Sequence, residues 1–254
     1  MSRLRRVLPS RLTPVLLVLM GAAALAMSGC TAWRINRAVE LARLSEPLQQ
    51  RPADPRLHLL IAGDSTAVGT GASTPSASLA GLIARDHPRL LIENRARDGA
   101  RFSDVLQQLA GDTRVDMVLV QAGGNDVIRL RDLDALQRDI EAVAERARQR
   151  SDLVVLMPAG NVGNAPFFFA PWSWWMTHRS RAMHRAVSQA AQRTGAVYVN
   201  LFHERSDDPF VAQPGLNAQD GLHPSDAGYA VWFRELMSQA RLAEPLAAAG
   251  PQPR

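Results

Sequence analysis

The stretch "LLIAGDSTAVGTGAS" (residues 59–73) decides how this chain folds. Its apolar run ends abruptly at Gly63-Asp64-Ser65, and a series of small residues follows. An apolar run that ends in Gly, Asp and Ser is typical of a buried strand that leaves a sheet through a tight turn. Ser65 therefore has two interpretations, a turn or helix-capping residue and a nucleophile, and the rest of the chain has to decide between them.

The alternation of apolar runs with helical segments predicts the fold class. Runs of strand length lie at 57–63, 89–94, 115–123, 152–160 and 196–202. Segments with helical spacing or caps separate or follow them, at 76–86, 102–110, 133–150, 178–195 and 223–243. Strands that are apolar throughout and alternate with helices predict an α/β fold whose parallel sheet is covered on both faces. Ligands of such folds bind beyond the carboxyl ends of the strands.

The predicted strand ends and the last loop carry residues suited to nucleophilic catalysis. Ser65 follows the first strand, Gly99 the second and Asn125 the third, while Asp220 and His223 lie in the loop "DGLHP". A serine needs a base within about 2.6–3.2 Å, and the base needs a carboxylate to orient it. The backbone N–H groups of Ser65 and Gly99 and the Asn125 amide are candidate donors to an oxyanion. Taken singly, each residue also has a structural interpretation, as a helix cap, a turn glycine or a loop acid.

Taken together, these motifs resemble the SGNH/GDSL hydrolase family. They occur in the family's order, as "GDS" (63–65), Gly99, "GGND" (123–126) and "DGLH" (220–223), and the resemblance spans about residues 57–240. It implies a flavodoxin-like three-layer α/β/α sandwich with a five-stranded parallel sheet, and no cofactor. It also implies Ser65 as nucleophile, His223 as base, Asp220 as its orienter, and Ser65, Gly99 and Asn125 as the oxyanion hole. The family usually has Leu where this chain has Thr66.

The N-terminal segment predicts export. A basic region is followed by the apolar run "TPVLLVLMGAAALAM" and by "MSGC", in which Cys30 is the one cysteine of the chain. This placement resembles the lipobox of bacterial lipoproteins, in which a diacylglycerol is attached to the cysteine and the signal is cut just before it. We therefore expect a signal peptide at 1–29, lipidation of Cys30 and a position on the periplasmic side of the outer membrane. An uncleaved anchor or an ordinary signal peptide are the alternatives.

The remaining segments divide the chain further. Residues 30–55 predict a tether with a short amphipathic helix, in which Ile35, Ala38, Val39 and Ala42 recur at helical spacing. We expect a hydrolase domain at 56–242 and a flexible tail at 243–254.

An aromatic loop, "NAPFFFAPWSWWM" (164–176), follows the fourth predicted strand. Its prolines argue against a regular helix or strand. It holds six of the chain's aromatic residues: Phe167, Phe168, Phe169, Trp172, Trp174 and Trp175. These residues predict a substrate-binding acyl pocket, a membrane-facing patch, or simply a small satellite core.

Charge and composition exclude some partners. The net charge is +5, but residues 1–29 hold four arginines and no acid, so the remainder carries +1 and predicts no nucleic-acid binding. The histidines other than His223 show no ligand spacing that predicts a metal site, and we expect them on the surface or in helices.

The expected function is an esterase, thioesterase or lysophospholipase that acts on a small ester or lipid-like substrate. The alternatives are an esterase that removes acetyl groups from an envelope polysaccharide, and a non-catalytic envelope lipoprotein that binds a ligand on the same fold.

Overall fold

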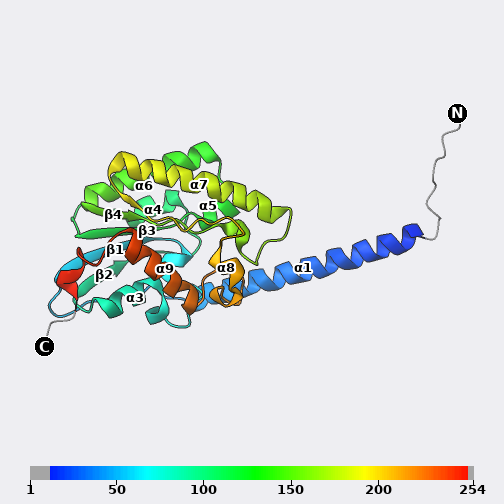
Figure 1. Ribbon diagram of the computed structural model, residues 1–254, viewed down its shortest axis with the longest axis horizontal. Helices are drawn as coiled ribbons and strands as arrows, with labels where there is room; N and C mark the ends of the chain where they lie inside the picture. Colours follow the sequence, from blue (N-terminus) through cyan, green and yellow to red (C-terminus); the bar gives the residue numbers. More distant parts are fainter. Residues whose placement is uncertain (1–11, 251–254) are drawn as a thin grey trace.

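Five parallel strands form the centre of the molecule, in the order β2-β1-β3-β4-β5 (Figure 1). The computed structural model describes residues 12–250. The strands are β1 (Leu57–Gly63), β2 (Leu90–Asn94), β3 (Met117–Gln121), β4 (Leu153–Leu156) and β5 (Val197–Tyr198). The chain runs from β1 to β2 on one side and then returns to β3 on the other. This reversal opens a crevice beyond the carboxyl ends of β1 and β3, where ligands of doubly wound sheets bind.

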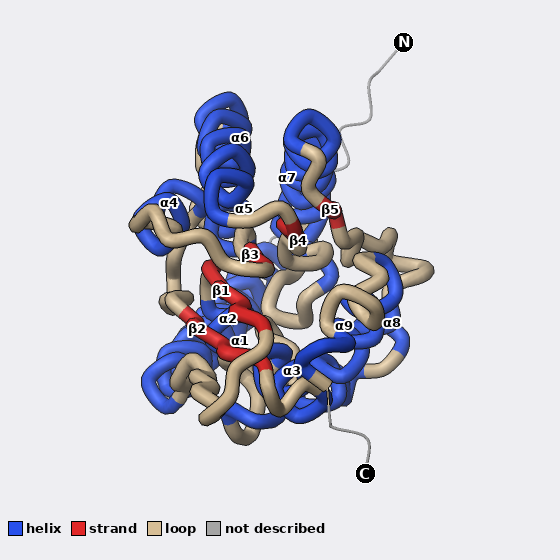
Figure 2. The backbone as a smooth tube through the Cα atoms, turned by 90° about the vertical axis from the view of Figure 1, so that its left-hand side faces the viewer, coloured by secondary structure: helices blue, strands red, loops and turns tan. Residues whose placement is uncertain are grey.

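Helices cover both faces of the sheet. Helices α4, α6 and α7 lie on one face and α3 and α9 on the other, with the strands between them (Figure 2). Their bounds are α3 (Leu79–Asp86), α4 (Phe102–Gln108), α6 (Leu133–Arg150), α7 (Trp172–Thr194) and α9 (Asp226–Gln239). Three short helices, α2 (Ser65–Val68), α5 (Gly124–Ile128) and α8 (Pro209–Ala212), lie in the connections. The predicted three-layer α/β/α sandwich is therefore confirmed.

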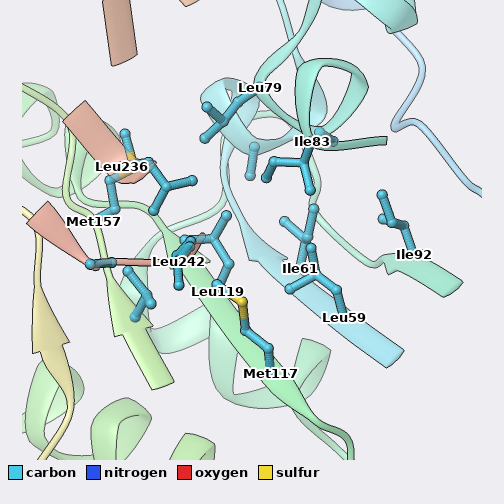
Figure 3. Packing of buried hydrophobic residues seen from close by; sticks show 14 of the residues in the cluster. Leu59, Ile61, Leu79, Ile83, Ile92, Met117, Leu119, Met157, Leu236 and Leu242 are labelled. Carbon is cyan, nitrogen blue, oxygen red and sulfur yellow. The ribbon is translucent and has the colours of Figure 1, made fainter. Parts of the chain in front are cut away.

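The strands are apolar throughout because both of their faces are buried. Leu59 and Ile61 of β1 pack with Leu79 and Ile83 of α3 in one core cluster (Figure 3). The alternate residues of β1 point to the opposite face, where Leu60 belongs to the cluster that includes α4, α6 and α7. Because side chains alternate along a strand, a single apolar run supplies both cores.

The last two strands are shorter than the sequence predicts. Strand β5 is an edge strand that pairs with β4 only through Val155–Val197 and Leu156–Tyr198. Beyond it, Val199 N still donates to the Leu156 carbonyl at 3.0 Å, and the side chains of Val199 and Leu201 are buried in the core although neither residue belongs to a strand. Apolarity indicates burial, and it does not distinguish a strand from a buried loop.

Helix α7 starts earlier than predicted, and the expectation of an irregular aromatic loop is wrong at its end. The helix begins at Trp172 with Pro171 as its N-cap, so Trp172, Trp174 and Trp175 form its first turn. A proline is compatible with a helix start because the first N–H groups of a helix have no partner within it.

The segments expected to be a tether and a loose tail pack onto the domain. The backbone of Gln50 pairs with Ile92 in both directions, at 3.1 and 2.9 Å. In the tail, Leu246 and Ala249 are buried, and the Ala249 carbonyl accepts a hydrogen bond from Arg89 N at 3.1 Å. These short segments bury only a few apolar residues each, which is too few for periodicity to reveal.

Helix α1 (Leu12–Leu44) is a single helix that joins the predicted signal segment to the predicted tether. Its first part projects away from the domain, and its last turns lie beside α8 (Figure 1). The basic residues that precede it lie outside the described residues. Within residues 12–250, no helix combines the length and apolarity that crossing a membrane requires.

Gly63 joins the ends of three strands. Its carbonyl accepts hydrogen bonds from Arg97 N at 3.1 Å and from the Gln108 side chain at 3.0 Å, and Gln108 Oε1 accepts from Gly63 N at 2.6 Å. A Cβ at this position would lie 1.9 Å from the carbonyl oxygen of Gln121 in β3. Residue 63 is therefore glycine because the backbones of β1 and β3 approach too closely for a side chain.

We expect Gly63→Ala to destabilise the domain by about 3 kcal/mol, because the new methyl group must push β1 and β3 apart. Urea unfolding would measure this as a lower midpoint with an unchanged slope. The control is Gly215→Ala, whose Cβ meets nothing within 4 Å. Equal stability of the two variants would contradict the close approach.

Candidate active site

Ser65 lies where β1 turns sharply into α2. Asp64 is the N-cap of α2, and its Oδ1 accepts hydrogen bonds from the backbone N–H of Thr66 at 2.9 Å and from the Thr66 hydroxyl at 2.7 Å. These bonds fix the turn that presents Ser65 at the carboxyl edge of the sheet. Thr66, the departure from the family pattern, thus secures the carboxylate beside the serine.

His223 and Asp220 approach Ser65 from the loop before α9. The Nε2 atom of His223 lies 2.9 Å from Ser65 Oγ, and its Nδ1 atom lies 2.5 Å from Asp220 Oδ2. Because a carboxylate accepts, Nδ1 carries the proton of the neutral ring, and Nε2 accepts from the serine hydroxyl. The structure therefore brings the three residues into one hydrogen-bonded chain.

Asp220 is held in its charged form although it is buried. Its Oδ1 accepts hydrogen bonds from the N–H groups of Leu222 at 2.9 Å and His223 at 3.1 Å. Burial acts to raise the pKa of this carboxyl, but the bond from the His223 ring and these backbone bonds keep the pKa below its ordinary value. Because Asp220 and His223 are three residues apart, one oxygen of the carboxylate binds the histidine ring while the other accepts hydrogen bonds from the backbone of the same loop.

The three candidate oxyanion donors border the same cavity as Ser65 Oγ. Within the described residues, neither the N–H groups of Ser65 and Gly99 nor the Asn125 amide donates to another protein group. Gly99 adopts a φ of +76°, in the left-handed region that favours glycine. Residue 99 is therefore glycine both because its backbone adopts this conformation and because a side chain would crowd a substrate.

The site opens into a cavity of about 420 Å³. Ser65, Gly99, Asn125 and His223 border it, and Asp220 does not. Many of its other walls are apolar, from Ile128, Val162, Phe167, Leu201, Phe210 and Trp232. A concave apolar cavity with a few convergent polar groups is typical of a site for a small organic ligand.

The aromatic residues at 167–175 do not act as one group. Phe167 borders the cavity, and Phe168 packs against the core on the α7 side of the sheet. The other four are exposed, by 43% to 72%: Phe169, Trp172, Trp174 and Trp175. Of these six residues the structure therefore places Phe167 in the cavity wall and Phe168 against the core, while the start of α7 turns the tryptophans outward.

Two buried carboxyls lie near the site, and no sequence pattern predicts their burial. Asp64 and Asp126 are both buried; Asp126 Oδ2 accepts from Phe102 N at 3.1 Å, and its Oδ1 has no partner among the described residues. Burial, with a smaller contribution from the nearby Asp64, raises the pKa of Asp126 to about 6. Burial also raises the pKa of Asp64, against the hydrogen bonds from Thr66. The sequence indicates only that Asp64 and Asp126 lie within the motifs "GDS" and "GGND".

Two histidines lie closer to the site than expected. His203 borders the cavity from a loop. His184 lies on α7 but is buried, with Nε2 2.8 Å from the Ala159 carbonyl and Nδ1 2.6 Å from the Tyr198 hydroxyl. Its burial lowers the pKa to about 4, so it is a neutral structural residue at pH 7. Across residues 12–250, no cluster of His, Cys, Asp and Glu side chains is arranged to hold a metal ion.

A parallel α/β/α sandwich with Ser, Gly, Asn and His at the carboxyl edge of its sheet defines the SGNH class of hydrolase folds. The family model described as "GDSL-like Lipase/Acylhydrolase family" matches residues 61–231. The chain therefore belongs to this family, as the motifs predicted.

Individual relatives agree with this assignment. The chain is 28% identical over 185 residues to a GDSL-like esterase, Rv1075c, of Mycobacterium tuberculosis (strain ATCC 25618 / H37Rv), an alignment that covers 69% of this chain and 59% of that protein. The chain thus spans about three fifths of the length of this curated relative.

Solved structures share the fold at low sequence identity. TesA matches with a TM-score of 0.58 at 22% identity, over 74% of this chain and 99% of that one. An acetylxylan esterase from Geobacillus stearothermophilus matches with a TM-score of 0.53 at 21% identity, over 74% and 95%.

We expect Asp126 to make the protein less stable as the pH rises. The unfolded carboxyl ionises near 3.8 and the folded one near 6, so its contribution is intact below about 3.8 and is lost as the pH rises through 6. That displacement corresponds to about 3 kcal/mol. Asp126→Asn, measured by urea unfolding between pH 4 and 7, should lack this loss, whereas Asp112→Asn on the surface should retain it. If the unfolding free energy of Asp126→Asn fell with pH as steeply as that of the wild type, the raised pKa of Asp126 would be contradicted.

Proposed function

We propose that this protein is a serine hydrolase that cleaves carboxylic esters through an acyl-enzyme. The observation that carries the proposal is the hydrogen-bonded chain from Ser65 through His223 to Asp220, at 2.9 and 2.5 Å. It lies beside three donors that have no acceptor within residues 12–250. Membership of the GDSL-like family supports it independently. Thioesters present the same acyl carbonyl to these groups and belong to the same proposal.

The proposed mechanism follows from the hydrogen bonds of the site. Ser65 Oγ attacks the acyl carbonyl while His223 Nε2 takes its proton, and the carbonyl electrons move onto the oxygen. The N–H groups of Ser65 and Gly99 and the Asn125 amide stabilise this oxyanion. When the oxyanion collapses, His223 donates the proton to the leaving alcohol and an acyl-Ser65 ester remains. Water then repeats the cycle, and the carboxylic acid and free serine are released.

Asp220 stabilises the charged ring that forms in each half of the reaction. Its carboxylate keeps the Nδ1 proton in place, so that Nε2 always faces the serine. Because two backbone N–H groups already bind its other oxygen, the carboxylate cannot rotate away without losing them. Asp220 thus acts through His223 rather than on the substrate.

We expect Ser65→Ala to abolish hydrolysis of p-nitrophenyl esters and labelling by a fluorophosphonate probe. Asp220→Asn should lower kcat by about 10³–10⁴-fold and leave KM nearly unchanged, because the histidine loses its orientation while the cavity stays intact. Circular dichroism and the unfolding midpoint would show that both variants are folded.

Residual activity in Ser65→Ala would overturn the mechanism. A folded wild type that neither hydrolyses esters of two to sixteen carbons nor reacts with the probe would favour the binding lipoprotein.

We also propose that the protein is anchored in a bacterial envelope through lipid on Cys30. Cys30 is exposed on α1, as modification requires. Cleavage before Cys30 would leave a helix that begins at the modified residue, about 7.5 Å along its axis from Ile35. The lipid would then hold the cavity within reach of the bilayer surface, on the periplasmic side of the outer membrane.

Mass spectrometry of the N-terminal peptide, after expression in a bacterium that processes lipoproteins, tests this anchor. The wild type should begin at Cys30 with the added mass of a diacylglycerol. Cys30→Ala should retain residues 1–29. A wild-type chain that retains these residues, or begins elsewhere, would contradict lipidation.

A further inference from the structure

The last turns of α1 form one side of the active-site cavity. Ile35, Ala38, Val39 and Ala42 border the same space as Ser65. Their spacing places all four on one face of the helix. The apolar face that the sequence predicts for this segment therefore faces the open side of the cavity.

Two arginines hold α1 against the loops that build the site. Arg34 donates a hydrogen bond to the Pro166 carbonyl, and its guanidinium lies 4.6 Å from the centre of the Phe169 ring. Arg37 donates to the side chain of Gln219, the residue before Asp220. One arginine thus holds the loop after β4, and the other holds the loop that carries the acid and the histidine.

The chain after α1 is fixed as well. Gln49 Nε2 donates to the Asn94 carbonyl at 2.6 Å, and Gln49 Oε1 accepts from Asn94 N at 3.1 Å. The backbone of Gln50 pairs with Ile92 next to it. Because these contacts follow α1 by only a few residues, its last turns have little freedom to leave the cavity.

The apolar face of α1 remains partly exposed to solvent. Ile35 is 48% exposed and Val39 is 44% exposed, although both border a cavity with other apolar walls. Removing such surface from water is favourable in proportion to its area. A hydrocarbon chain that enters the cavity would cover it with apolar groups, whereas a sugar would place hydroxyls against it, which costs their hydrogen bonds to water.

We propose that residues 34–42 of α1 form a wall of the acyl pocket and determine which acyl chain lengths this enzyme accepts. The inference rests on the proposed ester hydrolysis at Ser65 and adds the substrate class, esters of medium and long fatty acids. The segment that leads to the membrane anchor is then also part of the substrate site.

Filling the wall tests the inference in the full-length protein. In Ala38→Trp, the indole should occupy the space of a long chain and leave room for an acetyl group. We expect kcat/KM to fall at least tenfold on p-nitrophenyl dodecanoate and by less than twofold on the acetate. The matched control is Ala32→Trp, an exposed position of the same helix that does not border the cavity, and it should leave both values unchanged.

A second variant avoids the effects of added bulk. Val39→Ser removes apolar surface from the wall, so kcat/KM should fall several-fold on the dodecanoate, mainly through a higher KM, and stay constant on the acetate. The unfolding midpoint of each variant would show that the domain is intact.

The outcomes separate this inference from the proposed function. An unchanged or raised ratio of dodecanoate to acetate activity in Ala38→Trp overturns the inference, as does an equal loss on both esters. A wild type that hydrolyses acetate and no longer ester also overturns it, while ester hydrolysis that depends on Ser65 still stands. Ester hydrolysis that survives Ser65→Ala overturns the proposed function instead.

Discussion

The close approach of β1 and β3 at Gly63 is the constraint on which the site depends. Asp64 N donates to the Gln121 carbonyl at 2.9 Å at this point, so the two strands end side by side. Ser65 therefore enters the crevice only a few residues away from Asn125, which follows β3. The bond from Arg97 N to the Gly63 carbonyl brings the turn at Gly99 to the same edge. One peptide group thus helps to fix how Ser65, Gly99 and Asn125, the residues proposed as nucleophile and oxyanion donors, lie relative to one another.

Two buried carboxyls near the site reduce the stability of the folded protein. Asp64 and Asp126 are buried near one another, and burial raises the pKa of both carboxyls. Asp64 is needed because its side chain caps the short helix that presents Ser65. Asp126 gives a hydrogen-bond acceptor to the start of α4, but one of its oxygens has no partner among the described residues. Both carboxyls cost least when they are protonated, so the contribution of these two residues to stability is lost as the pH rises toward neutral.

The parts of the fold that the sequence predicts are those with a local physical cause. Strand β1 and helix α6 have their expected bounds because an unbroken apolar run and a capped amphipathic repeat determine them directly. The placement of Ser65 and Asn125 follows from a general rule, since parallel strands end at one edge of the sheet, and the motif "DGLH" predicts that His223 joins them. The start of α7 and the packing of Leu246 depend on tertiary contacts, and periodicity alone does not reveal them.

The last turns of α1 show this limit most clearly. The apolar positions Ile35, Ala38, Val39 and Ala42 are evident from the sequence, but amphipathicity tells which face of a helix is apolar and not what that face meets. Here it meets the cavity that holds Ser65, which no pattern within residues 31–55 indicates. Because the same helix runs on toward Cys30, the proposed anchor and the proposed acyl pocket would be mechanically connected. A change in how α1 lies against the domain would therefore alter which substrates fit, even though every group of the hydrogen-bonded chain stays in place.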